Sequence, residues 1–136
     1  MKPLRVILTE INTNETQRES KNFAKALRDS GFEVIPLGAG FSARQVARAA
    51  GQEDVDALCL WWVGDFDKEK FVNFLNQCAK ELDGAAPVFL CGDAPAEMND
   101  LSMAGANLTT LNGDMPFADI VETIKKTLDK SIKSSS

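Results

Sequence analysis

The sequence predicts an α/β fold of the flavodoxin-like (Rossmann-like), doubly wound type, with a five-stranded parallel sheet in the strand order 2-1-3-4-5. Short apolar runs alternate with longer segments of helical periodicity, an order typical of parallel sheets with right-handed crossovers. The length of 136 residues suits one domain, and no linker or internal repeat interrupts it. We therefore expect a single domain over residues 1–130 and a disordered polar tail over residues 131–136.

The first predicted strand is Leu4–Thr9, a mostly apolar run that suits a strand covered on both faces. The later runs predict further strands at Phe32–Pro36, Val55–Val63, Pro87–Cys91 and Ala106–Leu111. The third of these five runs is the most apolar.

The first helix carries signals at both ends. Thr13 and Asn14 are candidate N-caps, and Gly31 is placed to end the helix. Thr16 and Glu19 fit a capping box at the same N-terminus.

The second helix is expected to begin after the cap Ser42 and to end at Gly51. A short helix is expected over Pro95–Met103. Apolar side chains at helical spacing mark the inner faces of the third and last long helices, which are Phe71, Phe74, Leu75, Cys78 and Leu82, and Phe117, Ile120, Val121, Ile124 and Leu128.

Composition excludes several functions. A net charge of −5 argues against nucleic-acid binding, which needs a basic surface. No stretch approaches the roughly 20 apolar residues of a membrane helix. Three scattered cysteines without a CxxC motif favour a reduced, cytoplasmic setting. The sequence has no histidine, so the commonest metal ligand and general base are both absent.

In a doubly wound sheet, ligands bind beyond the carboxyl ends of the strands. The loops in which we expect a site are Thr9–Thr16, Gly38–Phe41, Trp61–Phe66, Cys91–Pro95 and Asn112–Pro116. Glu10 and Glu15 make the first loop unattractive to a flavin phosphate. A phosphorelay receiver would need an aspartate at the end of the third strand, where Trp61-Trp62 stands, so that activity is not expected.

Three segments resemble a known family. Arg5–Leu8, Ala26–Val34 and Gln52–Ala57 are similar, in sequence and in spacing, to the cobalamin-binding domain of methylmalonyl-CoA mutase and its relatives. The resemblance spans about residues 4 to 128. It implies the flavodoxin-like fold, a cobalamin cofactor, and a larger mutase-type catalytic chain or another oligomer partner.

The family's cofactor motifs are changed in this chain. The resemblance places Thr16 where the family has its cobalt-ligating histidine, Asn14 where it has the aspartate that orients this histidine, and Glu19 where it has a glycine. Trp61 stands in place of a serine that helps seat the cofactor's nucleotide tail. The nine motif-equivalent positions are Asn14, Thr16, Glu19, Trp61, Val63, Cys91, Gly92, Asn112 and Gly113.

Three hypotheses follow. The first is a non-catalytic, cobalamin-binding-like domain, related to the C-terminal domain or small subunit of methylmalonyl-CoA mutase, with a structural or interaction role and no bound cofactor or metal. The second is a corrinoid-binding subunit, for an isomerase or a methyl transfer, in which the cofactor keeps its own base on cobalt. The third is a crevice that binds another small molecule. No residue set supplies a nucleophile, a base and an oxyanion donor, so no catalytic residues are assigned.

Single residues have alternatives too. Trp61 and Trp62 are adjacent in a strand and should face opposite sides of the sheet, as core residues or, for Trp61, as a plug of the nucleotide slot. Cys59 and Cys78 are expected in the core, whereas Cys91, at a strand end, is a candidate for exposure. Four acidic residues are either a cation site or solvated loop residues and caps, namely Asp65, Asp67, Asp93 and Asp114.

Overall fold

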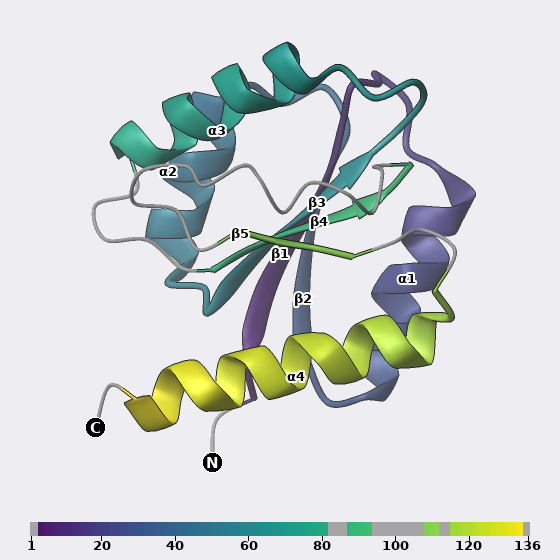
Figure 1. The fold of residues 1–136 in the computed structure, drawn as a ribbon, viewed down its shortest axis with the longest axis vertical. Helices are drawn as coiled ribbons and strands as arrows, with labels where there is room; N and C mark the ends of the chain where they lie inside the picture. Colours follow the sequence, from purple (N-terminus) through teal and green to yellow (C-terminus); the bar gives the residue numbers. More distant parts are fainter. Residues whose placement is uncertain (1–2, 82–86, 94–107, 112–114, 135–136) are drawn as a thin grey trace.

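The computed structural model describes residues 3–81, 87–93, 108–111 and 115–134. Its elements are β1 (Arg5–Ile11), α1 (Arg18–Asp29), β2 (Glu33–Gly38), α2 (Ala43–Glu53), β3 (Ala57–Trp62), α3 (Lys68–Glu81), β4 (Val88–Gly92), β5 (Leu108–Thr110) and α4 (Phe117–Ser134). Within these residues the strands form one parallel sheet in the order β2-β1-β3-β4-β5 (Figure 1). The predicted fold and strand order are confirmed.

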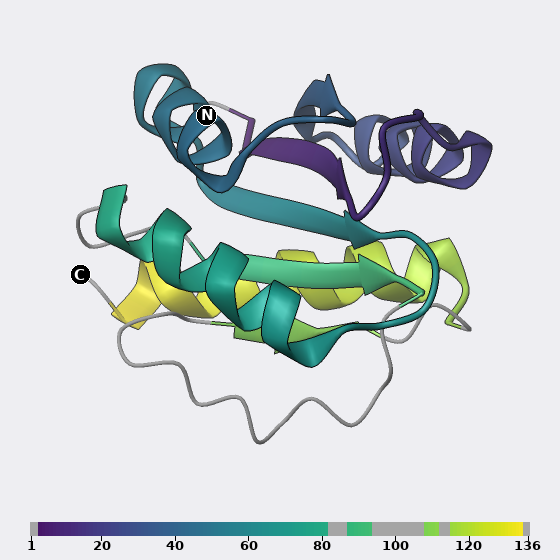
Figure 2. The ribbon, with the colours of Figure 1, turned by 90° about the horizontal axis from the view of Figure 1, so that it is seen from above.

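Helices cover both faces of the sheet. Figure 1 shows α1 and α4 on one side, hereafter the α1/α4 side, and α2 and α3 on the other, the α2/α3 side. Figure 2 shows the same layers from above, with α3 in front of the sheet and α4 behind it. Each side has its own core, with Trp61 on the α1/α4 side and Trp62 on the α2/α3 side. The predicted opposite orientation of the two indoles is confirmed, because successive strand residues alternate in direction.

β1 and β2 each extend two residues beyond the carboxyl ends predicted for them. β1 continues beyond Thr9 because Glu10 and Ile11 still pair with β3. β2 continues to Gly38, whose carbonyl oxygen accepts a hydrogen bond from the Thr9 hydroxyl at 2.8 Å. The extension of β1 moves the start of the following loop to Asn12, and this changes how α1 begins.

The predicted capping of α1 is wrong. The N-cap is Gln17, which makes no side-chain capping bond, so neither Thr13 nor Asn14 caps the helix and no Thr16–Glu19 box forms. The Thr13 hydroxyl instead accepts a hydrogen bond from the Glu15 amide at 3.1 Å, in a local turn. A side chain from β1 takes over the capping role, as described below.

The other helix ends divide between correct and incorrect predictions. Gly31, with φ +97°, ends α1 as predicted. Ser42 caps α2 as predicted, in a capping box completed by Gln45. Gly51 does not end α2, which continues to Glu53 and closes at Asp54 in the left-handed conformation. A Cβ at Gly51 would have no atom within 4 Å, so the structure does not require a glycine at this helical position.

The C-terminal part agrees with the prediction where it is described. β5 falls within the predicted strand, and the predicted inner face of α4 is buried from Ile120 to Leu128. α4 continues to Ser134, into the segment predicted as a polar tail. The predicted helix Pro95–Met103 and Leu82 lie outside the described residues. Among the helices that the structure describes, none has the length and apolar character to cross a bilayer.

Candidate functional site

At the carboxyl end of β3, the α1/α4 side is filled by aromatic rings. Trp61 is 4% exposed, and its ring centroid lies 5.4 Å from that of Phe23 on α1 and 6.2 Å from that of Phe117 on α4. Phe23 and Phe117 also meet each other edge to face, at 5.6 Å. These three residues, hereafter the Trp61 cluster, occupy the space between α1, α4 and the sheet, and each ring supports the others by apolar burial and favourable ring geometry.

The end of β4 packs against the same cluster. Cys91 pairs with Trp61 across the sheet and is fully buried, so this candidate for exposure is not exposed. The α1/α4 core covers the strand end. Burial, with a smaller contribution from nearby Cys59, raises the pKa of Cys91 well above its ordinary value. Cys59 and Cys78 are buried as predicted. A protonated, buried thiol is inert as a nucleophile.

Gly92 is explained by packing alone. Its φ is +84°, and a Cβ at this position would lie 2.5 Å from the Trp62 carbonyl oxygen and 3.2 Å from Trp61 Cδ1. A side chain does not fit there. The remaining positions after β5 in the motif comparison, Asn112 and Gly113, lie outside the described residues.

The loop between β1 and α1 carries the positions that match the family's histidine motif. Asn14, Thr16 and Glu19 are all exposed. A Cβ on Gly40 would lie 3.9 Å from Asn14 Oδ1, and a Cβ on Gly38 would lie 3.6 Å from Thr16 Oγ1. Asn14 and Thr16 therefore lie against the loop that follows β2, on the opposite side of β1 from β3 and Trp61.

A buried carboxylate anchors the N-terminus of α1. Glu10 is 4% exposed, and its two oxygens accept hydrogen bonds from the Gln17 amide at 3.1 Å and from the Ser20 hydroxyl at 2.6 Å. Its charge also complements the positive end of the helix dipole. Sequence reasoning considered Glu10 as a charge that repels phosphate and as a possible acidic residue of a receiver site, but not as a helix cap. The sequence has no clear signal for this contact, because Thr13 and Asn14 are good caps by type and lie closer to the helix.

Hydrogen bonds join the loop after β3 to both neighbouring loops. Asn12, with φ 68°, donates from Nδ2 to the Val63 carbonyl oxygen at 2.8 Å. On the other side, Asp93 accepts from the Gly64 amide at 2.7 Å. A left-handed conformation is uncommon outside glycine, and asparagine adopts it more readily than most residues. Val63, a motif-equivalent position, is half-buried and its carbonyl group is used within the protein.

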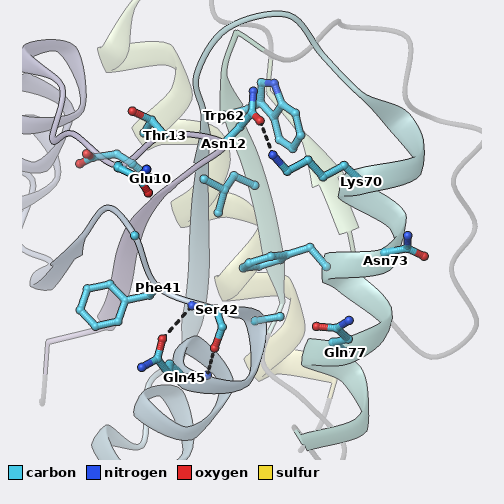
Figure 3. Close-up of a pocket in the computed structure, with 15 residues that line it drawn as sticks. Glu10, Asn12, Thr13, Phe41, Ser42, Gln45, Trp62, Lys70, Asn73 and Gln77 are labelled. Carbon is cyan, nitrogen blue, oxygen red and sulfur yellow. Dashed lines mark hydrogen bonds between the residues drawn. The ribbon is translucent and has the colours of Figure 1, made fainter.

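A cavity of about 640 Å³ opens on the α2/α3 side, away from the Trp61 cluster. The loop after β1, the start of α2 and one face of α3 line it (Figure 3). Phe41, 39% exposed, forms part of the wall near α2, while Lys70 and Gln77 extend from α3. Three of the loops in which a site was expected contribute to its lining, and the motif-equivalent residue Asn14 is among the lining residues, whereas Trp61 and Cys91 are not.

No metal centre forms in the part of the chain that the structure describes, since it holds no cluster of cysteine, aspartate or glutamate side chains that could bind an ion. Asp67 caps the start of α3 by accepting from the Lys70 amide at 3.1 Å, and Asp93 is bound to Gly64. These roles agree with the interpretation as caps and loop residues; Asp114 lies outside the described residues.

The comparisons with known proteins bear on this geometry. No family model matches the chain. A segment of 56 residues is 41% identical to the small subunit of 2-hydroxyisobutanoyl-CoA mutase from Aquincola tertiaricarbonis, over 41% of each chain. The crystal structure of a cobalamin-binding protein from Desulfitobacterium hafniense matches with a TM-score of 0.67 at 19% identity, over 92% of this chain and 59% of that one. The chain is similar to cobalamin-binding domains.

The similarity has clear bounds. The chain covers about two fifths of the mutase subunit it matches and less than two thirds of the cobalamin-binding protein. The signal receiver domain of the response regulator NarL from Mycobacterium tuberculosis also matches, with a TM-score of 0.63 at 17% identity over 95% of this chain and 98% of that one. At such identities the structural matches establish the flavodoxin-like fold alone.

The matched positions do not fit the family's usual way of holding cobalamin. The sequence has no histidine, and a threonine hydroxyl at position 16 is a poor ligand for cobalt. Trp61, which stands where the resemblance puts the serine that helps seat the nucleotide tail, is enclosed by Phe23 and Phe117. Thr16 and Trp61, the residues that depart from the family's cofactor motifs, both lie within the described ranges.

Proposed function

We propose that this chain is a non-catalytic, cobalamin-binding-like domain with a structural or interaction role in an acyl-CoA-mutase-type assembly. The observation that carries the proposal is the Trp61 cluster, in which a 4% exposed indole packs between Phe23 and Phe117. A domain of this fold with an enclosed indole at the position of the family's tail-binding serine, and with no histidine to bind cobalt, suits a role that needs no cofactor.

The partner in this proposal is a larger, mutase-type catalytic chain. The similarity to a protein described as a mutase small subunit supports it, because a small subunit acts together with a larger one. Three free, buried cysteines support a reducing, cytoplasmic setting for the assembly.

The described side chains give no support for catalysis by this chain alone. The buried carboxylate of Glu10 is fully engaged at the start of α1. Burial raises the pKa of Cys59 and that of Cys78 to about 12, so these thiols stay protonated near neutral pH. A non-catalytic role agrees with both observations.

The first test is an absorbance titration of the purified protein with hydroxocobalamin and adenosylcobalamin, with calorimetry alongside. We expect no saturable spectral change and no binding heat. Saturable binding with an unshifted, base-on spectrum would overturn the proposal in favour of a corrinoid carrier that dispenses with a protein histidine. In that case Trp61→Ser should change the affinity, since Trp61 adjoins the expected cofactor surface.

The second test concerns the partner. The protein is mixed with the large subunit of an acyl-CoA mutase from the same organism, and the mass of the mixture is measured by size-exclusion chromatography with light scattering. We expect a stable complex that forms without added cobalamin. A complex that forms only when cobalamin is present would contradict a cofactor-independent role.

A further inference from the structure

The cavity on the α2/α3 side has walls of different chemistry (Figure 3). Lys70, Phe74 and Gln77 line it from α3, and their spacing of i, i+4 and i+7 places them along one face of the helix. With a rise of about 1.5 Å per residue, Lys70 and Gln77 are roughly 10 Å apart along the axis. The α3 wall therefore presents a cation, an aromatic ring and a carboxamide in sequence.

Lys70 carries the charge that the cavity offers to a ligand. Its Nζ donates a hydrogen bond to Asn12 Oδ1 at 2.7 Å, and among the described residues no carboxylate forms an ion pair with it. Glu10 is the acidic residue of the lining, but its oxygens are bound to Gln17 and Ser20 on the α1 side. The Lys70 ammonium group at the cavity therefore has further N–H donors for a ligand, whereas the Glu10 carboxylate is hydrogen-bonded within the protein.

Two aromatic residues belong to the lining of the cavity. Phe41 is 39% exposed, the one large hydrophobic side chain so exposed in the part of the chain that the structure describes. Phe74 is half-buried on α3 and also lines the cavity. Exposed aromatic surface at the mouth of a cavity favours a ligand with a flat apolar body.

We propose that this cavity binds an organic monocarboxylate with a flat apolar body and a polar group at its far end. Lys70, positioned by its hydrogen bond to Asn12, holds the carboxylate, Phe74 packs against the body, and Gln77 hydrogen-bonds the far polar group. One ammonium balances one negative charge, and the chain's net charge of −5 disfavours ligands with more. The site lies across the sheet from the Trp61 cluster, so the proposal stands or falls independently of the proposed function.

The test is a ¹H–¹⁵N NMR titration with 4-hydroxybenzoate, followed at the side-chain amides of Asn12 and Gln77 and at the Trp62 indole. We expect saturable shifts with a Kd in the millimolar range. The uncharged analogue 4-hydroxybenzamide should bind at least about threefold more weakly, because it lacks the charge that Lys70 binds. Absence of saturation, or equal Kd values for the two compounds, would overturn the proposal.

Variants locate the binding. Lys70→Met should weaken 4-hydroxybenzoate at least about threefold and leave 4-hydroxybenzamide unchanged. The matched control is Lys68→Met, which removes an exposed charge from α3 outside the cavity and should leave both Kd values unchanged. Equal weakening by the two variants would mean non-specific charge attraction and would contradict the assignment.

Two further arms define the ligand class. Gln77→Leu should abolish the preference for 4-hydroxybenzoate over benzoate, and a preserved preference would remove Gln77 from the site. Phenyl phosphate has a phosphate group in place of the carboxylate and carries a second negative charge. It should bind more weakly than benzoate, and tighter binding would overturn the assignment of a monocarboxylate.

Discussion

The two tryptophans at the end of β3 are neighbours in sequence, yet they lie in regions with different packing. On the α1/α4 side, Trp61 is enclosed by Phe23 and Phe117, and the space between helices and sheet is filled. On the α2/α3 side, Trp62 packs on Phe66 and Phe71, but a cavity remains beyond it, next to α3. In this parallel sheet, side chains therefore fill the space on the α1/α4 side, which we call the closed side, whereas a cavity remains on the α2/α3 side, the open side.

Removing the indole on the closed side should have the largest effect. Trp61→Ala should lower the free energy of unfolding by about 3–5 kcal/mol, because it leaves a large cavity between α1 and α4. Phe41→Ala, on the open side, should cost at most about 1 kcal/mol, since that ring is already accessible. Urea denaturation measures both. Similar losses for the two variants would mean that the sides are not packed differently.

Gly92 tests how tightly the closed side meets β3. Gly92→Ala should cost about 2 kcal/mol or more, because the residue has φ +84° and a Cβ would press on the Trp62 carbonyl oxygen. The control is Gly51→Ala, at an open helical position, which should stabilise the protein by up to about 1 kcal/mol. Thermal denaturation compares them, and a neutral Gly92→Ala would show that the strand ends can relax.

Glu10 lies at the boundary between the two sides. Glu10→Ala should cost about 1–3 kcal/mol, because the Gln17 amide and the Ser20 hydroxyl lose their buried acceptor. Glu15→Ala, in the same loop but exposed, should change stability by less than about 0.5 kcal/mol. Helicity measured by circular dichroism should fall for Glu10→Ala; equal stability of the two variants would refute the cap.

The cysteines give the finest comparison. Burial raises the pKa of Cys59 and of Cys78 from 9.0 to about 12 and that of Cys91 also upward, so native thiols should react very slowly at pH 8. Cys78, 2% exposed on α3, should react before the fully buried Cys59 and Cys91. Mass spectrometry after timed alkylation gives the order, and rapid labelling of Cys91 in the folded protein would contradict a closed side.

The same pKa shifts predict how stability depends on pH. Above about pH 9 the unfolded chain releases thiol protons that the folded chain retains up to about pH 12. The thiols therefore contribute fully to stability below pH 9, and that contribution is lost as pH rises through this range. Between pH 9 and pH 12, the free energy of unfolding should fall more steeply with pH for the protein than for the triple variant Cys59→Ala, Cys78→Ala, Cys91→Ala. Denaturant unfolding at a series of pH values measures both slopes, and equal slopes would contradict the prediction.

Sequence patterns predicted those parts of the fold that depend on local periodicity. Five apolar runs became the strands, and Ser42 and Gly31 marked the helix ends at which they were expected. The failures occur where a distant partner decides. Thr13 and Asn14 are good caps by type, but Glu10 on β1 reaches the start of α1 first, and no local pattern contains that contact.

Prediction of the candidate site was similarly divided. A ligand site was expected at five loops of the carboxyl edge, from the parallel topology, and residues of three of them line the cavity. Cys91 was misplaced, because its burial depends on α4 packing over β4 from far along the chain. Helical spacing alone aligns Lys70, Phe74 and Gln77, but only the fold brings the loop of Gly40 and Phe41 to the other side of the cavity.

The sequence by itself determined the doubly wound architecture, the absence of histidine and the opposite directions of Trp61 and Trp62. Each of these is set by periodicity or by composition, which need no contact between distant residues. Only the tertiary structure decided which indole became enclosed and which side kept a cavity. That outcome depends on how α1 and α4, or α2 and α3, pack across the sheet, and close packing is a property of side chains brought together from the whole chain.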